Sequence, residues 1–195
     1  MSTFDYPPGA TPLNLEELDG LKLKHIRTRA ELDRWEQENI QEALAWLSRR
    51  RKADILDEKF IFQLHDKMFN KVWQWAGSCR RSDKNIGVTW SRVPVELRQL
   101  LDDTKTWIEY SAYSPDEIAL RFHHRLVWIH LFPNGNGRHA RLITDVLLTE
   151  LLNQEAFTWG SSDLSNSGTV RKQYITALKA ADAYDYNLLQ RFVRS

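Results

Sequence analysis

The sequence contains only one cysteine, and it lacks any long apolar run. A single cysteine cannot form a disulfide within the chain, and a chain without disulfides suits a reducing compartment. No stretch approaches the ~18 apolar residues that a membrane-spanning helix needs. The first residues also lack the basic start and the apolar segment of a secretion signal. We therefore expect a cytoplasmic protein with no membrane partner.

The sequence also lacks an excess of charge of either sign. Its 27 Lys and Arg residues face 26 Asp and Glu residues, so the formal net charge is +1. Non-specific binding to nucleic acid needs a large basic excess, and direct nucleic-acid binding is therefore not expected. What is present is ordinary for a globular protein: 195 residues, of which 42% are apolar and 27% are charged. This length favours a single domain.

Most of the chain carries the sequence signals of helices. Asn14 with Glu17, and Thr28 with Glu31, form capping-box patterns that predict two helix starts. Apolar spacing and cap residues predict helices over 28–50, over 57–75, from Ser114 to before Pro133, from Asn136, and over 168–193 with a break near Tyr184. In the helix over 28–50, the expected buried stripe consists of Leu32, Trp35, Ile40, Ala43, Leu44 and Leu47.

One segment has a different period. Ile86, Val88 and Trp90 alternate with Gly and Thr, which is typical of a strand, and this predicts a short β-hairpin or extended flap over residues 80–92. The predicted fold class is therefore all-α, a helical bundle with a short β-hairpin flap. The expected division is an arm and short helix over 1–24 and one domain over 25–195.

The segment richest in chemistry runs from His130 to Arg141, with the sequence HLFPNGNGRHAR. An imidazole such as that of His130 has an ordinary pKa of about 6.5, which suits it to remove a proton from a hydroxyl at neutral pH. Gly135 and Gly137 let successive backbone N–H groups point into one concavity at a helix start, where an anion can bind. Arg138 and Arg141 lie three residues apart, so both can contact one oligophosphate. The segment therefore predicts an oligophosphate site with a base beside it.

Each of these features also has an ordinary structural interpretation. A Pro-Asn-Gly-Asn-Gly run is a good turn between helices, a histidine at a helix end is often a cap, and arginines on a helix are usually solvated. Their occurrence within 12 residues favours the functional interpretation. The neighbouring His139 is expected on the surface. No zinc site is expected, because ligand spacing to a carboxylate or cysteine is lacking at His25, His65, His123 and His124.

The same segment resembles the signature of Fic-domain (Fido) proteins, His-x-Phe-x-Asp/Glu-Gly-Asn-Gly-Arg-x-x-Arg. It departs from that signature at Asn134, where the family usually has an acidic residue. The resemblance covers roughly residues 25–193 and includes Trp75-Ala76-Gly77, Arg80, Asn85-Ile86-Gly87, Trp90 and the closing segment from Tyr174 to Tyr186. The early part is also similar to the branch called mobile mystery protein B, which is carried on mobile elements.

This resemblance implies transfer of AMP from ATP to a Tyr, Thr or Ser hydroxyl of a target protein, with release of pyrophosphate. It implies that His130 is the general base. The residues implied to bind ATP and its phosphates are Asn134, Gly135, Asn136, Gly137, Arg138 and Arg141. Phe132 is implied to anchor the loop in the core.

The resemblance also implies roles outside the signature. A flap would dock the main chain of the target by strand addition, through Lys84, Asn85, Ile86, Gly87 and Val88. Tyr174 and Asp182 would line the nucleoside pocket. Asn134 would be a ligand of Mg²⁺, but an amide oxygen brings no charge. We therefore expect weaker metal dependence or slower turnover, but not inactivity.

Many Fic proteins carry an inhibitory helix with the pattern Ser/Thr-x-x-x-Glu-Gly/Asn, whose Glu pairs with the second arginine of the signature. Glu38 and Asn39 match the end of this pattern, with Arg34 in the Ser/Thr place. The resemblance thus implies that Glu38 holds Arg141 and inhibits the enzyme. The alternative is an ordinary surface pair between Arg34 and Glu38.

Two alternatives to AMP transfer stay open. The scaffold in relatives also transfers phosphate or phosphocholine, or removes AMP again as a deAMPylase. The second alternative is that the chain is a non-catalytic nucleotide-binding module of a toxin–antitoxin pair. By family analogy, the expected target is a type II topoisomerase, and a cognate antitoxin or regulator is a second expected partner.

Overall fold

The computed structural model describes residues 11–51, 54–161 and 168–195. Its helices, in chain order, are α1 (Leu15–Asp19), α2 (Arg29–Arg49), α3 (Glu58–Phe69), α4 (Val93–Glu109), α5 (Pro115–Ile129), α6 (Asn136–Glu150), α7 (Thr169–Asp182) and α8 (Asn187–Val193). Two single turns of 3₁₀ helix precede α4 and α7, η1 (Trp90–Arg92) and η2 (Trp159–Ser161). The predicted all-α class is confirmed.

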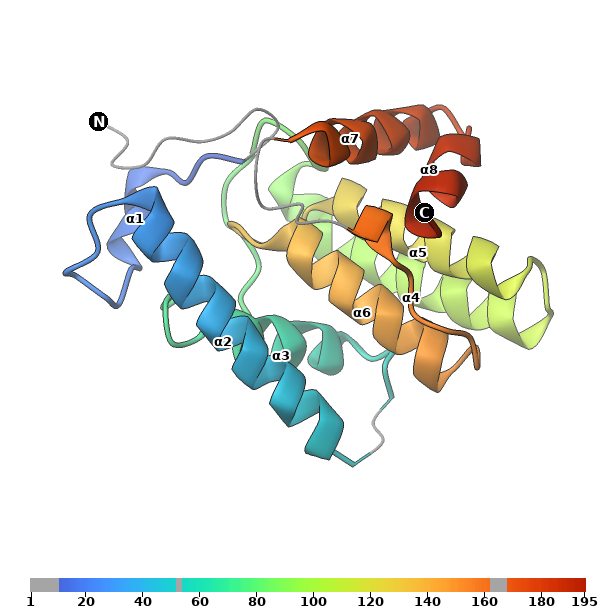
Figure 1. Ribbon diagram of the computed structural model, residues 1–195, viewed down its shortest axis with the longest axis horizontal. Helices are drawn as coiled ribbons and strands as arrows, with labels where there is room; N and C mark the ends of the chain where they lie inside the picture. The colour runs from blue at the N-terminus through green and yellow to red at the C-terminus, as the bar shows by residue number, and fades with distance from the viewer. Residues whose placement is uncertain (1–10, 52–53, 162–167) are drawn as a thin grey trace.

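Helices α5 and α6 lie side by side at the centre of the bundle (Figure 1). On one side they share a large apolar core with α2, α3 and α4. On the other side, Ala119 of α5 and Leu148 of α6 belong to a second, smaller core with α7 and α8. The turn between α5 and α6 is therefore held between two cores. In the described part of the chain, no helix has the length and apolar character to cross a membrane.

The predicted helix starts and stops are largely confirmed. Both capping boxes are formed, at Asn14 and at Thr28, and the Ser114 side chain accepts a hydrogen bond from the third residue of α5. Helix α5 ends at Ile129 because His130 adopts the left-handed conformation, with φ 58°. The chain also breaks between α7 and α8 near Tyr184, which has φ 64°.

Residues 11–24 pack onto the rest of the bundle. Leu13 and Leu21 are buried in the larger core, and Leu21 forms an isolated antiparallel bridge with Trp73. The described part of the predicted N-terminal arm and short helix is therefore continuous with the domain that follows. Residues 1–10 of the predicted arm lie outside the described residues.

The buried face of α2 differs from the predicted apolar stripe. Trp35 and Leu44 are 39% and 38% exposed, whereas Glu36 and Asn39 are buried. The Asn39 side chain donates to the carbonyl of Lys67 at 3.0 Å, and its oxygen accepts the backbone N–H that follows α3. Polar side chains with hydrogen-bond partners thus replace two of the expected apolar contacts.

Two helix assignments also differ from the prediction. Helix α3 ends at Phe69, six residues before the predicted end, and the chain then turns through residues 70–77. Helix α4, with Pro94 in its first turn, was not singled out by the sequence analysis.

The predicted β-hairpin over residues 80–92 is wrong. No named strand occurs in the described residues, and this segment is a loop that leads into η1. Ile86 and Trp90 are 45% and 46% exposed, so the alternating side chains have no facing strand. The loop is closed instead by Asp83, whose carboxylate accepts the backbone N–H of Trp90 at 2.7 Å. We call residues 80–89 the flap loop.

Candidate active site

The backbone of His130 is fixed by a buried arginine from the flap loop. The Arg80 guanidinium is 1% exposed and donates to the His130 carbonyl at 2.6 Å, and also to the carbonyls of Ser82 and Val88. Since His130 has a left-handed conformation, its carbonyl is free of the α5 ladder and can accept this bond. Arg80 therefore joins the flap loop to the end of α5.

The imidazole of His130 is neutral at physiological pH. Burial, and secondarily the Arg80 charge, lowers the pKa of His130 to about 4. Its Nε2 lies 3.1 Å from Oγ1 of Thr11. A neutral ring with one nitrogen facing a hydroxyl has the protonation state that a general base requires.

The loop after His130 is closed by Asn136, the first residue of α6. The Asn136 side chain accepts from the Phe132 N–H at 2.9 Å and donates to the Phe132 carbonyl at 2.8 Å. Phe132 itself is fully buried, which agrees with its predicted role as an anchor. Gly135 has φ 79°, and a Cβ there would lie 2.6 Å from the ring of Phe69. The first-turn N–H groups of α6 have no partner within the helix and can bind an anion.

His65 holds this loop from the side of α3, a role that the sequence did not indicate. Its Nε2 bonds to the Asn134 carbonyl at 3.1 Å, its Nδ1 accepts the Gly77 N–H at 3.0 Å, and its ring stacks on Phe132 with centroids 3.6 Å apart. Burial lowers the pKa of His65 well below 6.5. Both nitrogens are therefore used to position the loop.

The prediction that His139 lies on the surface is wrong. Its side chain is 1% exposed and bonds to the Ile61 carbonyl at 3.0 Å, and burial lowers its pKa to about 4. Helix α6 lies between both cores, so a residue away from its most apolar stripe is still covered.

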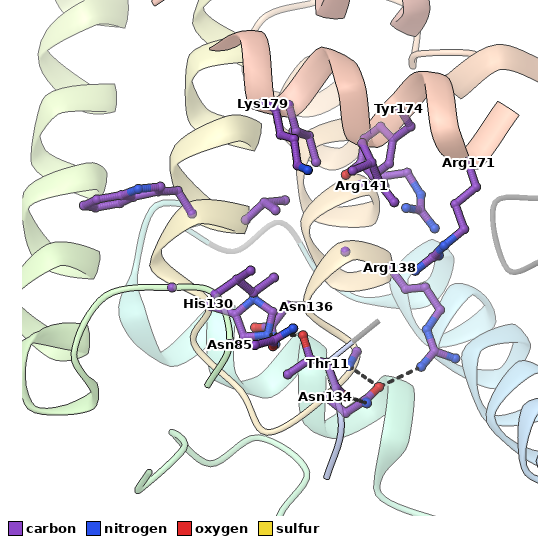
Figure 2. Close-up of a pocket in the computed structure, with 18 of the residues that line it drawn as sticks. Thr11, Asn85, His130, Asn134, Asn136, Arg138, Arg141, Arg171, Tyr174 and Lys179 are labelled. Atoms are coloured by element: carbon purple, nitrogen blue, oxygen red, sulfur yellow. Dashed lines mark hydrogen bonds between the residues drawn. The ribbon is translucent and has the colours of Figure 1, made fainter. Parts of the chain in front are cut away.

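A cavity of about 1030 Å³ opens above this loop. Figure 2 shows His130 beside Thr11, and Arg138 beside Asn134. Arg141 and Arg171 lie farther from His130 in the same view. The basic side chains among its described lining residues are Arg29, Arg138, Arg141, Arg171, Lys172 and Lys179, and the acidic ones are Asp33 and Asp182. Six cations against two carboxylates make the cavity strongly attractive to a polyanion.

Arg171 is a member of this cluster that the sequence analysis missed. Burial lowers its pKa, and the charges of Arg141, Arg29 and Arg138 lower it further. The positive charges of its neighbours therefore disfavour the charged form of Arg171, and a bound oligophosphate would offset that effect. The signal in the sequence was weak: Arg171 lies three residues before Tyr174, on the same face of α7.

The flap residues divide into two groups. Asn85, Ile86 and Gly87 line the cavity, and Gly87 has φ 100° with no room for a Cβ, which would lie 2.6 Å from Cβ of His130. Lys84 forms a buried ion pair with Glu17, and Val88 accepts a hydrogen bond from Arg80. The docking role of residues 84–88 stays a prediction, and Lys84 and Val88 have structural contacts instead of facing the cavity.

Tyr174 and Asp182 both line the cavity, as expected for a nucleoside pocket. Tyr174 also bonds to Nε2 of His123 at 2.8 Å, and Asp182 bonds to Nε2 of His124 at 2.9 Å. These contacts fix α7 against α5. Contact of Tyr174 and Asp182 with a nucleoside stays a prediction.

Glu38 does not lie where the sequence analysis predicted. Its carboxylate pairs with Arg34 at 3.1 Å on the exposed face of α2, with half of the Glu38 side chain in solvent. The predicted contact between Glu38 and Arg141 is therefore wrong, and the ordinary surface pair is observed.

Glu36, one half-turn earlier on α2, lies next to Arg138, the first arginine of the signature. It is 2% exposed, accepts the indole N–H of Trp73 at 2.6 Å, and forms an ion pair with Arg138 at 2.7 Å. The sequence did contain a signal for it: Glu36 lies four residues after Leu32 and four before Ile40, within the buried stripe. An acidic residue in such a stripe needs a buried partner.

The side chain of Asn134 does not offer a prepared site for Mg²⁺. Its oxygen accepts the Gly135 N–H at 2.7 Å and lies 3.4 Å from the Arg138 guanidinium, while its nitrogen donates to the Thr11 carbonyl at 3.3 Å. A cation would compete with a donor there and would lie beside a positive charge. Within the described ranges, no group of three or more His, Cys, Asp or Glu is placed to hold a metal. These contacts do not fit a protein-held magnesium ion.

Comparison with known proteins identifies the fold and the family. Residues 55–148 match the model of the Fic/DOC family. Protein adenylyltransferase Fic of Aedes aegypti is 31% identical over 101 residues, which are 50% of this chain and 20% of that protein. The chain spans between a fifth and about a quarter of the length of the curated relatives it matches.

Two solved structures share this arrangement of helices. The N-terminal Fic domain of Bep8 from Bartonella sp. 1-1C superposes with a TM-score of 0.72 over 90% of both chains, at 14% identity. BepC from Bartonella tribocorum, solved with bound AMPPNP, superposes with a TM-score of 0.68 over 93% of this chain and 97% of that chain, at 17% identity. At these identities the likeness concerns the fold.

Proposed function

The chain contains a domain of the Fic/DOC family, and on that premise we propose that it transfers AMP from ATP to a hydroxyl side chain of a protein, releasing pyrophosphate. The observation that carries this proposal is the neutral ring of His130 beside the first turn of α6, with a cluster of arginines farther along the same cavity. The names of the curated relatives and the AMPPNP held by BepC support it.

Each part of the cavity has a role in this reaction. Arg138, Arg141 and Arg171 hold the triphosphate and neutralise the charge that develops on the leaving pyrophosphate. The N–H groups of the first turn of α6 orient the α-phosphate. His130 accepts the proton of the acceptor hydroxyl, whose oxygen then bonds to the α-phosphorus as the bond to the β-phosphate oxygen breaks. Magnesium dependence stays a prediction, and no step here relies on a protein-held metal.

Labelled nucleotide separates AMP transfer from its alternatives. We expect the purified chain, incubated with ATP and Mg²⁺ in a bacterial lysate, to incorporate label from the α-phosphate and none from the γ-phosphate. Label from the γ-phosphate alone would indicate a kinase. Label from neither position would contradict AMP transfer by the wild type and would leave full repression, removal of AMP, transfer of another group, or a nucleotide-binding module. A purified type II topoisomerase, added as a separate acceptor, tests the target suggested by family analogy.

The ion pair between Glu36 and Arg138 predicts that the wild-type chain is partly inhibited. While Arg138 is held by a buried carboxylate, it is less available to a phosphate. Glu36→Gln keeps an oxygen for the Trp73 N–H but removes the charge that holds Arg138. We expect the initial rate of AMP transfer to rise roughly tenfold, in the ordinary range of coupling between two sites.

Glu38→Gln is the matched control for this variant. It removes the same charge from the same helix, two residues away, at an exposed position. Its rate should equal that of the wild type. An unchanged or lower rate for Glu36→Gln, at equal thermal stability, would show that the ion pair does not restrain transfer.

A further inference from the structure

The N-terminal arm places a side-chain hydroxyl on the proposed base. Thr11 is 8% exposed, and its Oγ1 lies 3.1 Å from Nε2 of His130, within the cavity that Gly135 to Gly137 also line (Figure 2). Neither the family signature nor the flap accounts for this residue. The position beside His130 is the one that an acceptor hydroxyl must occupy for proton transfer.

Three contacts from different parts of the chain hold the arm there. The Asn134 side chain donates to the Thr11 carbonyl at 3.3 Å, and the Lys84 ammonium donates to the Pro12 carbonyl at 3.3 Å. The next residue, Leu13, is buried in the larger core. Residues 11–13 are therefore fixed on both sides, by the α5–α6 loop and by the flap loop, and the hydroxyl does not reach His130 by chance.

The electrostatics favour a hydroxyl that can react. Because burial keeps His130 neutral, its Nε2 can accept the Thr11 proton in the tautomer protonated on Nδ1. By contrast, both ring nitrogens of His65 bond to backbone groups. His130 is thus paired with a side-chain hydroxyl, which is the acceptor group of the proposed reaction.

We propose that Thr11 is the acceptor of an intramolecular AMP transfer, so that the chain modifies its own N-terminal arm; this inference rests on the proposed function. The Thr11 proton passes to Nε2 of His130, and Oγ1 forms a bond to the α-phosphorus of ATP. The bond between that phosphorus and the bridging oxygen breaks, and pyrophosphate leaves. Thr11 becomes a phosphodiester of AMP, and no oxidant or further reactant is needed.

Mass spectrometry of the full chain tests this acceptor. We expect the wild type and Glu36→Gln, incubated with ATP and Mg²⁺, to gain one AMP that peptide mapping places on Thr11. Thr11→Ser should still be modified, and Thr11→Val should lose the modification at this peptide. Thr106→Val, on the exposed face of α4, is the matched control and should behave as the wild type. The first-order rate constant should not change when the protein is diluted, because the reaction is intramolecular.

The other outcomes overturn the proposal in distinguishable ways. AMP on a different residue, unaffected by Thr11→Val, would remove Thr11 as the acceptor while leaving the transferase. A second outcome is that the wild type carries no AMP on Thr11 while Thr11→Val transfers more AMP to lysate proteins. This would indicate that the arm blocks access to His130 and is not an acceptor. No transfer to any acceptor, by the wild type or by Glu36→Gln, would contradict both this inference and the proposed function.

Discussion

Replacing His130 by alanine should lower AMP transfer by roughly 10²–10⁴-fold, the usual effect of losing a general base. The loss should be in the chemical step, because the ring of His130 lies at the opposite end of the cavity from Arg141 and Arg171. Binding of ATP should therefore be retained. The two measurements are the initial rate with α-labelled ATP and the dissociation constant from calorimetry.

Two further variants make this result interpretable. His130→Asn keeps a polar side chain in a buried position but has no basic nitrogen, so it should lose as much activity as alanine. His25→Ala, at an exposed position, is the matched control and should keep the wild-type rate. If His130→Asn folds, binds ATP and transfers AMP at a rate within a factor of about three of the wild-type rate, His130 is not the general base.

Acid should destabilise the folded protein at pH values above those at which most of its carboxylates become protonated. Burial lowers the pKa of His130 and His139 to about 4 and that of His123 to about 3. In the unfolded chain these rings have pKa values of about 6.5, so the unfolded state binds more protons between pH 6.5 and about 4. The free energy of unfolding is therefore greatest above pH 6.5 and decreases as the pH falls through this window.

The expected size of the effect is large for a single domain. Each of the three histidines should lower the free energy of unfolding by about 2 kcal/mol at pH 5 relative to pH 7.5, since one pH unit corresponds to ~1.4 kcal/mol. Asp145 opposes them, since burial raises its pKa to about 6 and its protonation favours the folded state as the pH falls. This offset is about 1 kcal/mol at pH 5, which leaves a net loss of about 5 kcal/mol from these four groups. Burial also lowers the pKa of His65, which adds to the loss.

Urea denaturation at pH 7.5 and pH 5 measures this loss directly. His139→Asn keeps a side-chain donor for the Ile61 carbonyl and removes one titrating ring, so its stability should depend on pH less steeply, by about 1.4 kcal/mol per unit. Equal stability at the two pH values would contradict the burial of neutral histidines.

The parts of the site that sequence analysis found are those encoded locally. His130, the two glycines and the two arginines lie within 12 residues, and the helices on either side are strongly apolar. Helix starts at Asn14, Thr28 and Ser114 were equally local, because a cap and its partner lie three residues apart. Such features can be predicted from the sequence because they depend only on residues that are close together in the chain.

The parts that sequence analysis missed depend on distant contacts. Thr11 reaches His130 across 119 residues of sequence, and Glu36 reaches Arg138 across 102. The predicted contact between Glu38 and Arg141 is not formed, because position 36 lies on the buried face of α2 and position 38 lies on the exposed face. The hairpin failed for a related reason: alternation was present in residues 86–90, but a strand needs a partner, and Arg80 and Asp83 supply other hydrogen bonds to this loop.

The two-core construction has a consequence for how the molecule responds to its ligand. The cations around the cavity come from α2 and α6, which share the larger core, and from α7, which belongs to the smaller one. A nucleotide bound by all three helices would add contacts between the two cores, which otherwise meet mainly through α5 and α6. Binding of nucleotide should therefore stabilise the α7–α8 part of the molecule against local unfolding, in addition to its contacts with α5 and α6.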